Sequence, residues 1–169
     1  MTTNFAMKTW LRLLLILMTV GGGFTGFAFT LQGLFSASSV LNFLLTLAFV
    51  GLYSFVTISG LLFVQDPSRI RPILAALAIQ VPSISLPFFA YHFAAGFDTF
   101  VGLRSAQAGD QTSFHLSGLI GGMWQLAFLR DNPLLIGINP VALTLFLILW
   151  RARQQSRCPN EPNLIPLAE

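Results

Sequence analysis

The chain has 169 residues, of which 54% are hydrophobic and only 9% are charged. A soluble domain carries about 25% charged residues, so this composition leaves too little charge to cover a globular surface. The formal net charge of +3 comes from cations that flank apolar stretches, where they set orientation and contact lipid headgroups. The composition therefore excludes an ordinary soluble domain and argues against a nucleic-acid partner.

Uncharged apolar stretches predict four membrane-spanning helices. No charged side chain occurs between Leu13 and Gln65, a stretch long enough for two spans of about 20 residues each. The four predicted spans are residues 11–31, 40–64, 73–96 and 134–150. We therefore expect an all-α membrane protein, a four-transmembrane-helix antiparallel bundle that forms a single domain over residues 1–153. The proline-rich segment 154–169 should be a flexible cytoplasmic tail.

Basic residues orient the predicted spans, because Lys and Arg accumulate in cytoplasmic segments. Of the nine Lys and Arg residues, only Arg104 and Arg130 fall on the non-cytoplasmic side. The others are Lys8, Arg12, Arg69, Arg71, Arg151, Arg153 and Arg157. We expect an integral protein of a bacterial inner membrane with both termini in the cytoplasm. A signal peptide is disfavoured, because the apolar run after Arg12 continues to Leu31, beyond the usual length of such a segment.

The segment 97–133, between the third and fourth spans, is the only extramembrane piece large enough to fold. Two apolar runs, 114–120 and 123–129, flank Gly121 and Gly122, a pair that suits a tight hairpin turn. We expect a small non-cytoplasmic β-hairpin here, with an interfacial helix as the alternative. Trp124 suits a membrane interface or a partner surface, so Gly121 and Trp124 are the predicted contact residues for another membrane protein.

Small residues on one face of the first span predict close helix packing. Gly22 and Gly26 form a G-x-x-x-G pair, which lets two helix backbones approach each other in lipid. Packing against another span of the same chain is the simpler interpretation. Dimerisation through this face is the alternative, and it would produce a homo-oligomer.

Polar residues in the second and third spans predict a small buried cavity. Pro82 and Pro87 should kink the third span and free backbone carbonyls that need polar partners. Tyr53 and Thr57 share one face of the second span at helical spacing. The side chains predicted to line the cavity are Gln80, Ser83, Tyr53 and Thr57. An ordinary structural seam between kinked helices would explain the same pattern.

No residue pattern names a reaction. His92 and His115 are weak candidates for binding a cofactor, since two histidines without nearby Cys or carboxylates make a poor metal or haem site. Ser83 or Ser85 with His92 and Asp98 is the one nucleophilic set that can be assembled. On a helix Ser85 would lie about 10 Å from His92, too far for a hydrogen bond. The single Cys158 excludes thiol chemistry that needs a cysteine pair.

These observations favour a non-enzymatic polytopic membrane protein that acts as an accessory, assembly or regulatory component of a membrane complex. Membrane lipids and a membrane-protein partner are the expected contacts, and no metal or cofactor is expected. The alternative is a small transporter, channel or lipid-binding protein with its polar site at the Pro82/Pro87 break.

Overall fold

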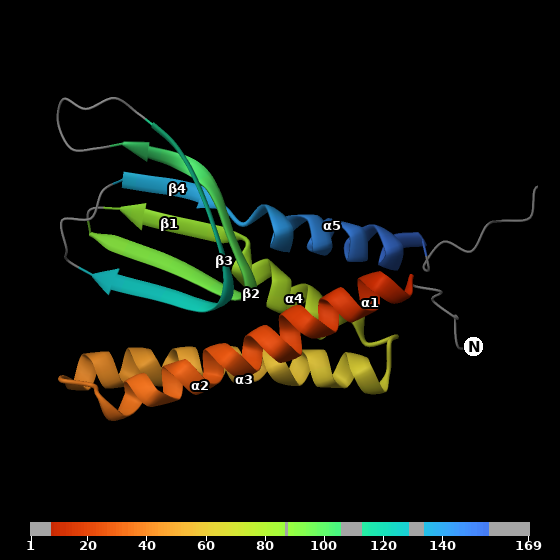
Figure 1. The fold of residues 1–169 in the computed structure, drawn as a ribbon, viewed down its shortest axis with the longest axis horizontal. Coiled ribbons are helices and arrows are strands. Elements are labelled where there is room, and N and C mark those ends of the chain that lie inside the picture. Colours follow the sequence, from red (N-terminus) through yellow and green to blue (C-terminus); the bar gives the residue numbers. More distant parts are fainter. Residues whose placement is uncertain (1–7, 87, 106–112, 129–133, 156–169) are drawn as a thin grey trace, which may run out of the picture.

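The computed structural model describes residues 8–86, 88–105, 113–128 and 134–155. Helices and strands alternate in blocks along the chain, as Figure 1 shows. The elements are α1 (Thr9–Ile16), the π-helical turn η1 (Leu17–Gly21), α2 (Gly22–Phe35), α3 (Val40–Gln65), α4 (Ile70–Gln80), β1 (Pro82–Leu86), β2 (Phe89–Ser105), β3 (Ser113–Phe128), β4 (Leu134–Ile138) and α5 (Pro140–Gln155).

A long helical hairpin runs the length of the molecule. The continuous stretch Thr9–Phe35 (27 residues) and α3 (26 residues) are both long and apolar enough to cross a membrane. The backbone N–H of Asn42 donates to the Ser39 hydroxyl, which caps the start of α3. At the other end Arg12 donates to the carbonyl of Val64 over 3.1 Å and ties the two helices together. The first two predicted helices therefore form.

The predicted third span, 73–96, is wrong. Helix α4 ends at Gln80, and the chain continues as β1 and then β2. Pro82 explains the end of the helix, because proline has no N–H to donate and its ring collides with the carbonyl of the residue four positions earlier. Pro82 terminates the helix here instead of kinking it.

The predicted fourth span and the predicted hairpin are also wrong. Residues 134–138 form β4, and only from Pro140 does the chain become helical. The proposed turn at Gly121–Gly122 lies inside one continuous strand, β3, which pairs along its length with β2. Residues 114–128 of the predicted segment 114–129 are thus neither a hairpin nor an interfacial helix, and residue 129 lies outside the described residues. A four-stranded antiparallel sheet takes up parts of the third and fourth predicted spans, whose remaining parts form α4 and α5, so the molecule is not an all-α four-helix bundle.

The sheet curls on itself, because β2 and β3 bend in the middle. Gly96 and Gly121 are direct partners across the two strands, and both have positive φ, 93° and 143°. A left-handed backbone favours glycine, so the bend sits where both strands carry one. Strand β1 pairs with the first half of β2 and β4 pairs with the second half. Since β1 also pairs with β4, these strands bridge the two arms of the bend.

The sheet and the short helices share one side of the hairpin. The sheet lies over the half that contains the α2–α3 connection, and α4 and α5 lie over the other half (Figure 1). One buried cluster joins α1, η1 and α3 to α4 and α5, and the other joins α3 and α4 to β2. Members of the first include Leu15, Phe63, Leu77 and Leu149, and members of the second include Phe49, Tyr53, Val56 and Phe93.

Candidate functional site

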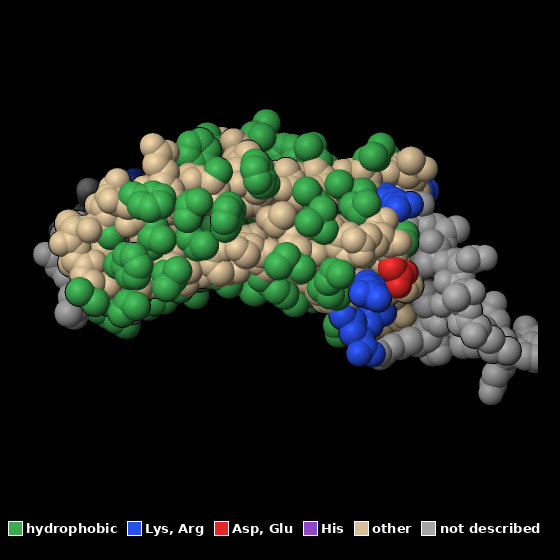
Figure 2. Space-filling model, turned by 90° about the horizontal axis from the view of Figure 1, so that it is seen from below, with side chains coloured by type: hydrophobic (Ala, Val, Ile, Leu, Met, Phe, Trp, Pro, Cys, Tyr) green, Lys and Arg blue, Asp and Glu red, His purple; other side chains and the backbone are tan. Residues whose placement is uncertain are grey.

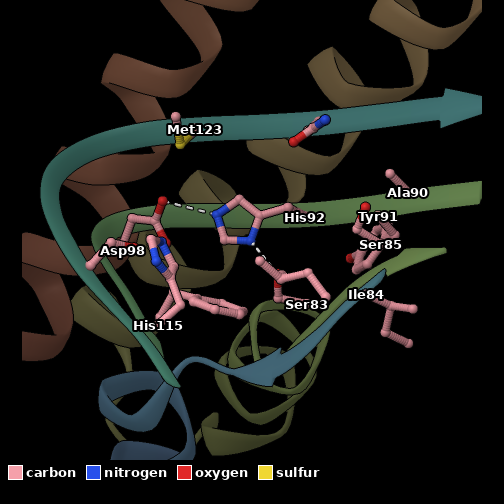
Figure 3. Close-up of a pocket in the computed structure, with 13 residues that line it drawn as sticks. Ser83, Ile84, Ser85, Ala90, Tyr91, His92, Asp98, His115 and Met123 are labelled. Atoms are coloured by element: carbon pink, nitrogen blue, oxygen red, sulfur yellow. Dashed lines mark hydrogen bonds and ion pairs between the residues drawn. The ribbon is translucent and has the colours of Figure 1, made fainter. Parts of the chain in front are cut away.

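A polar pocket of about 150 Å³ lies between the two arms of the curled sheet. It is lined from β1, β2, β3 and β4, so residues far apart in the sequence meet there. The polar side chains that line it are Ser83, Ser85, Tyr91, His92, Asp98, His115, Ser117 and Gln125. Ala90, Phe100, Met123 and Leu135 are among the apolar ones. Figure 3 shows how these side chains gather inside the bend.

Ser83, His92 and Asp98 form one hydrogen-bonded chain in this pocket. The Ser83 hydroxyl lies 2.8 Å from His92 Nδ1, and Asp98 Oδ2 lies 2.8 Å from His92 Nε2. His92 stands between the other two in Figure 3. A carboxylate can only accept hydrogen bonds, so Nε2 must carry the hydrogen. For a neutral imidazole Nδ1 is then the acceptor, and Ser83 donates its hydroxyl hydrogen to it.

Strand pairing explains why these three residues meet. The register pairs Ile84 with Tyr91, which places Ser83 opposite His92 on the same face of the sheet. The bend at Gly96 then turns the second half of β2 back, so that Asp98 reaches the other ring nitrogen. Ser83 and Asp98 are only 4% and 6% exposed, so both are held inside the protein.

One oxygen of Asp98 is left without a partner. Its Oδ1 atom is buried and has no hydrogen-bond partner among the described residues. A buried carboxylate oxygen without a donor costs about 1–3 kcal/mol or more. Because Asp98 lines the pocket, a donor supplied by a molecule in the pocket would remove this cost.

The curled sheet is polar inside and apolar outside. Cross-strand partners on its outer face are Leu103, Phe114 and Ile136 in one row and Val101, Leu116 and Ile138 in the next. Phe114 and Leu116 are each 68% exposed. A soluble sheet places its polar face toward water, and here the arrangement is reversed. The outer face needs an apolar environment.

The predicted cavity residues do not all meet. Ser83 lines the pocket, whereas Gln80 and Tyr53 lie in the contact between the helices and the sheet and Thr57 lies against Gly23 of α2. Gln80 accepts a 2.9 Å hydrogen bond from the backbone N–H of Ala95, and the Tyr53 hydroxyl donates to the carbonyl of Ala94 over 3.1 Å. The Thr57 hydroxyl donates to the carbonyl of Tyr53 within α3. The Gln80 and Tyr53 hydrogen bonds therefore join α4 and α3 to β2.

The small residues of the first span pack inside the chain. Gly22 lies against the backbone of Gly96, and Gly26 lies against the Tyr53 ring and the backbone of Gly122.

The predicted partner residues are placed differently from each other. Trp124 stacks on Phe49 with ring centroids 4.4 Å apart, so its ring is engaged within the molecule. Gly121 has open space where a side chain would be.

The two histidines line the same pocket. His115 packs its ring against Phe100, with the centroids 5.8 Å apart. Within the described residues no group of three or more His, Cys, Asp or Glu side chains could hold a metal ion. His92 is instead occupied by Ser83 and Asp98.

Ser117 and Gln125 are polar pocket residues that sequence reasoning missed. The signal was available in the alternation of β3, where His115, Ser117, Met123 and Gln125 line the pocket and Phe114 and Leu116 face outward.

Comparison with known proteins found nothing similar, since no family model, no curated protein and no solved structure matches the chain.

Proposed function

We propose that this is an integral membrane protein that binds a small polar molecule, or the polar end of a lipid, in the pocket of its curled sheet. The main observation behind this proposal is that the sheet turns its apolar face outward and holds Ser83, His92 and Asp98 on its inner face. The proposal keeps the lipid-binding alternative raised by the sequence and moves its site from a kinked helix to a sheet.

The helical hairpin supports a membrane location. A helix of 26 residues is about 39 Å long, enough to cross a hydrocarbon core of about 30 Å. Large apolar side chains such as Phe24 and Phe29 are more than 60% exposed. Figure 2 shows the face of the molecule formed by the helical hairpin, and hydrophobic side chains cover much of its length.

Basic side chains support an orientation in which one end of the helical hairpin faces the cytoplasm. Lys and Arg side chains gather at one end of the face seen in Figure 2. That end contains the start of α1, the α3–α4 connection and the end of α5 (Figure 1). By the positive-inside rule it faces the cytoplasm. The sheet then lies beside the half of the hairpin farther from the cytoplasm, where its apolar outer rows contact lipid.

The chemistry of the pocket defines the bound group. The unpaired Asp98 oxygen accepts a hydrogen bond, so the ligand carries a hydroxyl or an amino group. A cavity of about 150 Å³ suits a molecule near the size of benzene. A lipid headgroup and a free small solute share this chemistry, and the experiment distinguishes them.

The orientation predicts the reactivity of Cys158, the only cysteine, which lies outside the described residues. A membrane-impermeant maleimide should leave it unmodified in intact cells and modify it after the membrane is opened, because the end of α5 lies at the basic end. A cysteine introduced in place of Ser105, at the last residue of β2 and away from the basic end, should be modified already in intact cells. Equal labelling of Cys158 in intact and opened cells would contradict the orientation.

Binding is tested by native mass spectrometry of protein extracted in a mild detergent. The wild-type protein should retain one small molecule, and fragmentation should identify it as a lipid or a soluble solute. Asp98→Asn should reduce the bound fraction at least about tenfold, since losing a hydrogen bond to a charged group costs about 1.5–3 kcal/mol. Asp66→Asn changes an exposed carboxylate between α3 and α4 and is the matched control, expected to bind normally. A wild-type protein without a bound molecule, or equal binding by Asp98→Asn, contradicts the proposal.

A further inference from the structure

We propose that Ser83 is a catalytic nucleophile, with His92 as its general base and Asp98 as the residue that positions His92, for hydrolysis of small carboxylic esters in this pocket. The inference rests on the proposed pocket but goes beyond binding. It also departs from the expectation of a non-enzymatic protein.

The hydrogen-bonded chain has the connectivity that serine activation requires. A serine hydroxyl becomes nucleophilic when a base takes its proton during attack, and a third group holds that base in the correct tautomer. Here the two 2.8 Å contacts of His92 supply both relations. Asp98 accepts from Nε2, which leaves the Nδ1 lone pair directed at the Ser83 hydroxyl. In serine proteases Nε2 faces the serine and Nδ1 faces the aspartate. Here Nδ1 faces Ser83 and Nε2 faces Asp98, and the proton can move from the serine to the imidazole in the same way.

The contact with His92 identifies Ser83 as the nucleophile. Ser85 and Ser117 line the same space, and the Ser83 hydroxyl lies 2.8 Å from His92 Nδ1. Apolar side chains, including Ala90 and Met123, provide room for a short acyl group beside it. Among the lining residues, His115 and Gln125 carry the other side-chain nitrogens that can donate to an oxyanion.

The reaction balances with water as the second substrate. Ser83 Oγ attacks the ester carbonyl carbon while its proton moves to His92 Nδ1. The bond from that carbon to the alkoxy oxygen breaks, and the departing alcohol takes the proton from His92. Water then attacks the acyl-serine, gives a proton to His92 and releases the carboxylic acid. The same proton returns to Ser83.

Phenylmethanesulfonyl fluoride is the probe for this nucleophile, because its sulfonyl group bonds to an activated serine as fluoride leaves. Treatment of the purified full chain in detergent should add one sulfonyl group, and peptide mapping should place it on Ser83. Denaturing the wild-type protein in urea before treatment should abolish the reaction, since the activation depends on the fold. Hydrolysis of p-nitrophenyl acetate should stop in parallel with labelling.

Variants separate the roles of the three residues. Ser83→Ala should remove labelling, and His92→Gln should slow it by at least about 100-fold, the usual contribution of a general base. Asp98→Asn should lower the limiting labelling rate by a similar factor. It should leave the half-saturating probe concentration nearly unchanged, because this probe has no N–H or O–H to donate to Asp98 and the residue affects its reaction through His92. Ser59→Ala removes a buried hydroxyl on α3 and is the control expected to label normally.

The wild-type results alone decide the proposal if a variant fails to fold. No adduct on Ser83, or an adduct that also forms in urea, overturns it, as does equal labelling of a folded His92→Gln. If labelling fails while Asp98→Asn still loses its bound molecule, binding stands and catalysis does not. If Ser83 labels while no variant affects binding, catalysis stands and the proposed binding function fails.

Discussion

Replacing Asn139 by alanine should lower the free energy of unfolding by about 3 kcal/mol, because this one side chain joins three elements. Its Oδ1 accepts from the backbone N–H groups of Val141 and Ala142, both at 3.1 Å, and so caps α5. The same oxygen accepts from the Thr99 hydroxyl, and Nδ2 donates to the carbonyl of Phe97 over 3.0 Å. Losing a cap costs about 1 kcal/mol, and each buried group left unpaired costs about 1–3 kcal/mol more.

Ser39→Ala is the matched control, because Ser39 caps α3 at an exposed position. Its loss should cost about 1 kcal/mol or less. Thermal or denaturant unfolding of both variants in the same detergent, followed by circular dichroism, measures the difference. Equal effects of the two substitutions would mean that Asn139 does not hold β2 against α5.

Asn139 also shows what the sequence offered and how it was misinterpreted. Asn at a helix N-cap followed by Pro at the first helical position is a recognised start signal, because neither residue disrupts hydrogen bonding there. The predicted span 134–150 places Asn139 and Pro140 inside a helix. The helix begins at Pro140, and the residues before it form β4. Apolar residues 134–138 are too few to show helical or strand periodicity by themselves.

The first two helices were predictable because their signal is long and uninterrupted. The strands were not, since β2 is buried on both faces over Phe93–Gly96 and so shows no alternation there. Pro82 indicates where the helix ends, because a proline ends a helix more often than it kinks one. With Pro82 taken as a helix end, the polar and apolar alternation of Ser83, Ile84 and Ser85 predicts a strand.

The sequence identified the three residues of the candidate site but not the contacts between them. Ser83, His92 and Asp98 were considered together, and helical spacing argued against contact. In the sheet, β1 and β2 form a tight antiparallel pair, so Ser83 faces His92 across it. The position of Asp98 depends on the bend at Gly96, which in turn depends on Gly121 in a distant strand. A pairing of that kind cannot be inferred from local patterns.

Replacing Gly22 by alanine should destabilise the protein by about 3 kcal/mol, although alanine favours a helix by about 1 kcal/mol. A methyl group at this position would collide with the backbone of Gly96 and Ala95. Backbone at a bend of two paired strands cannot move aside as a flexible side chain can, so α2 and the sheet must separate. Such a separation should also weaken the pocket, because Gly96 directs Asp98 toward His92.

Gly33→Ala, in the same helix, is the matched control. A methyl group there would meet only Thr46 Cγ2, at 3.9 Å, an ordinary contact. This variant should therefore be as stable as the wild type or slightly more stable. Denaturant unfolding in one detergent compares the two, and labelling of Ser83 reports the pocket. Because helix propensity changes equally in both variants, any difference between them measures the contact of α2 with the bent strands, and the absence of a difference would disprove that contact.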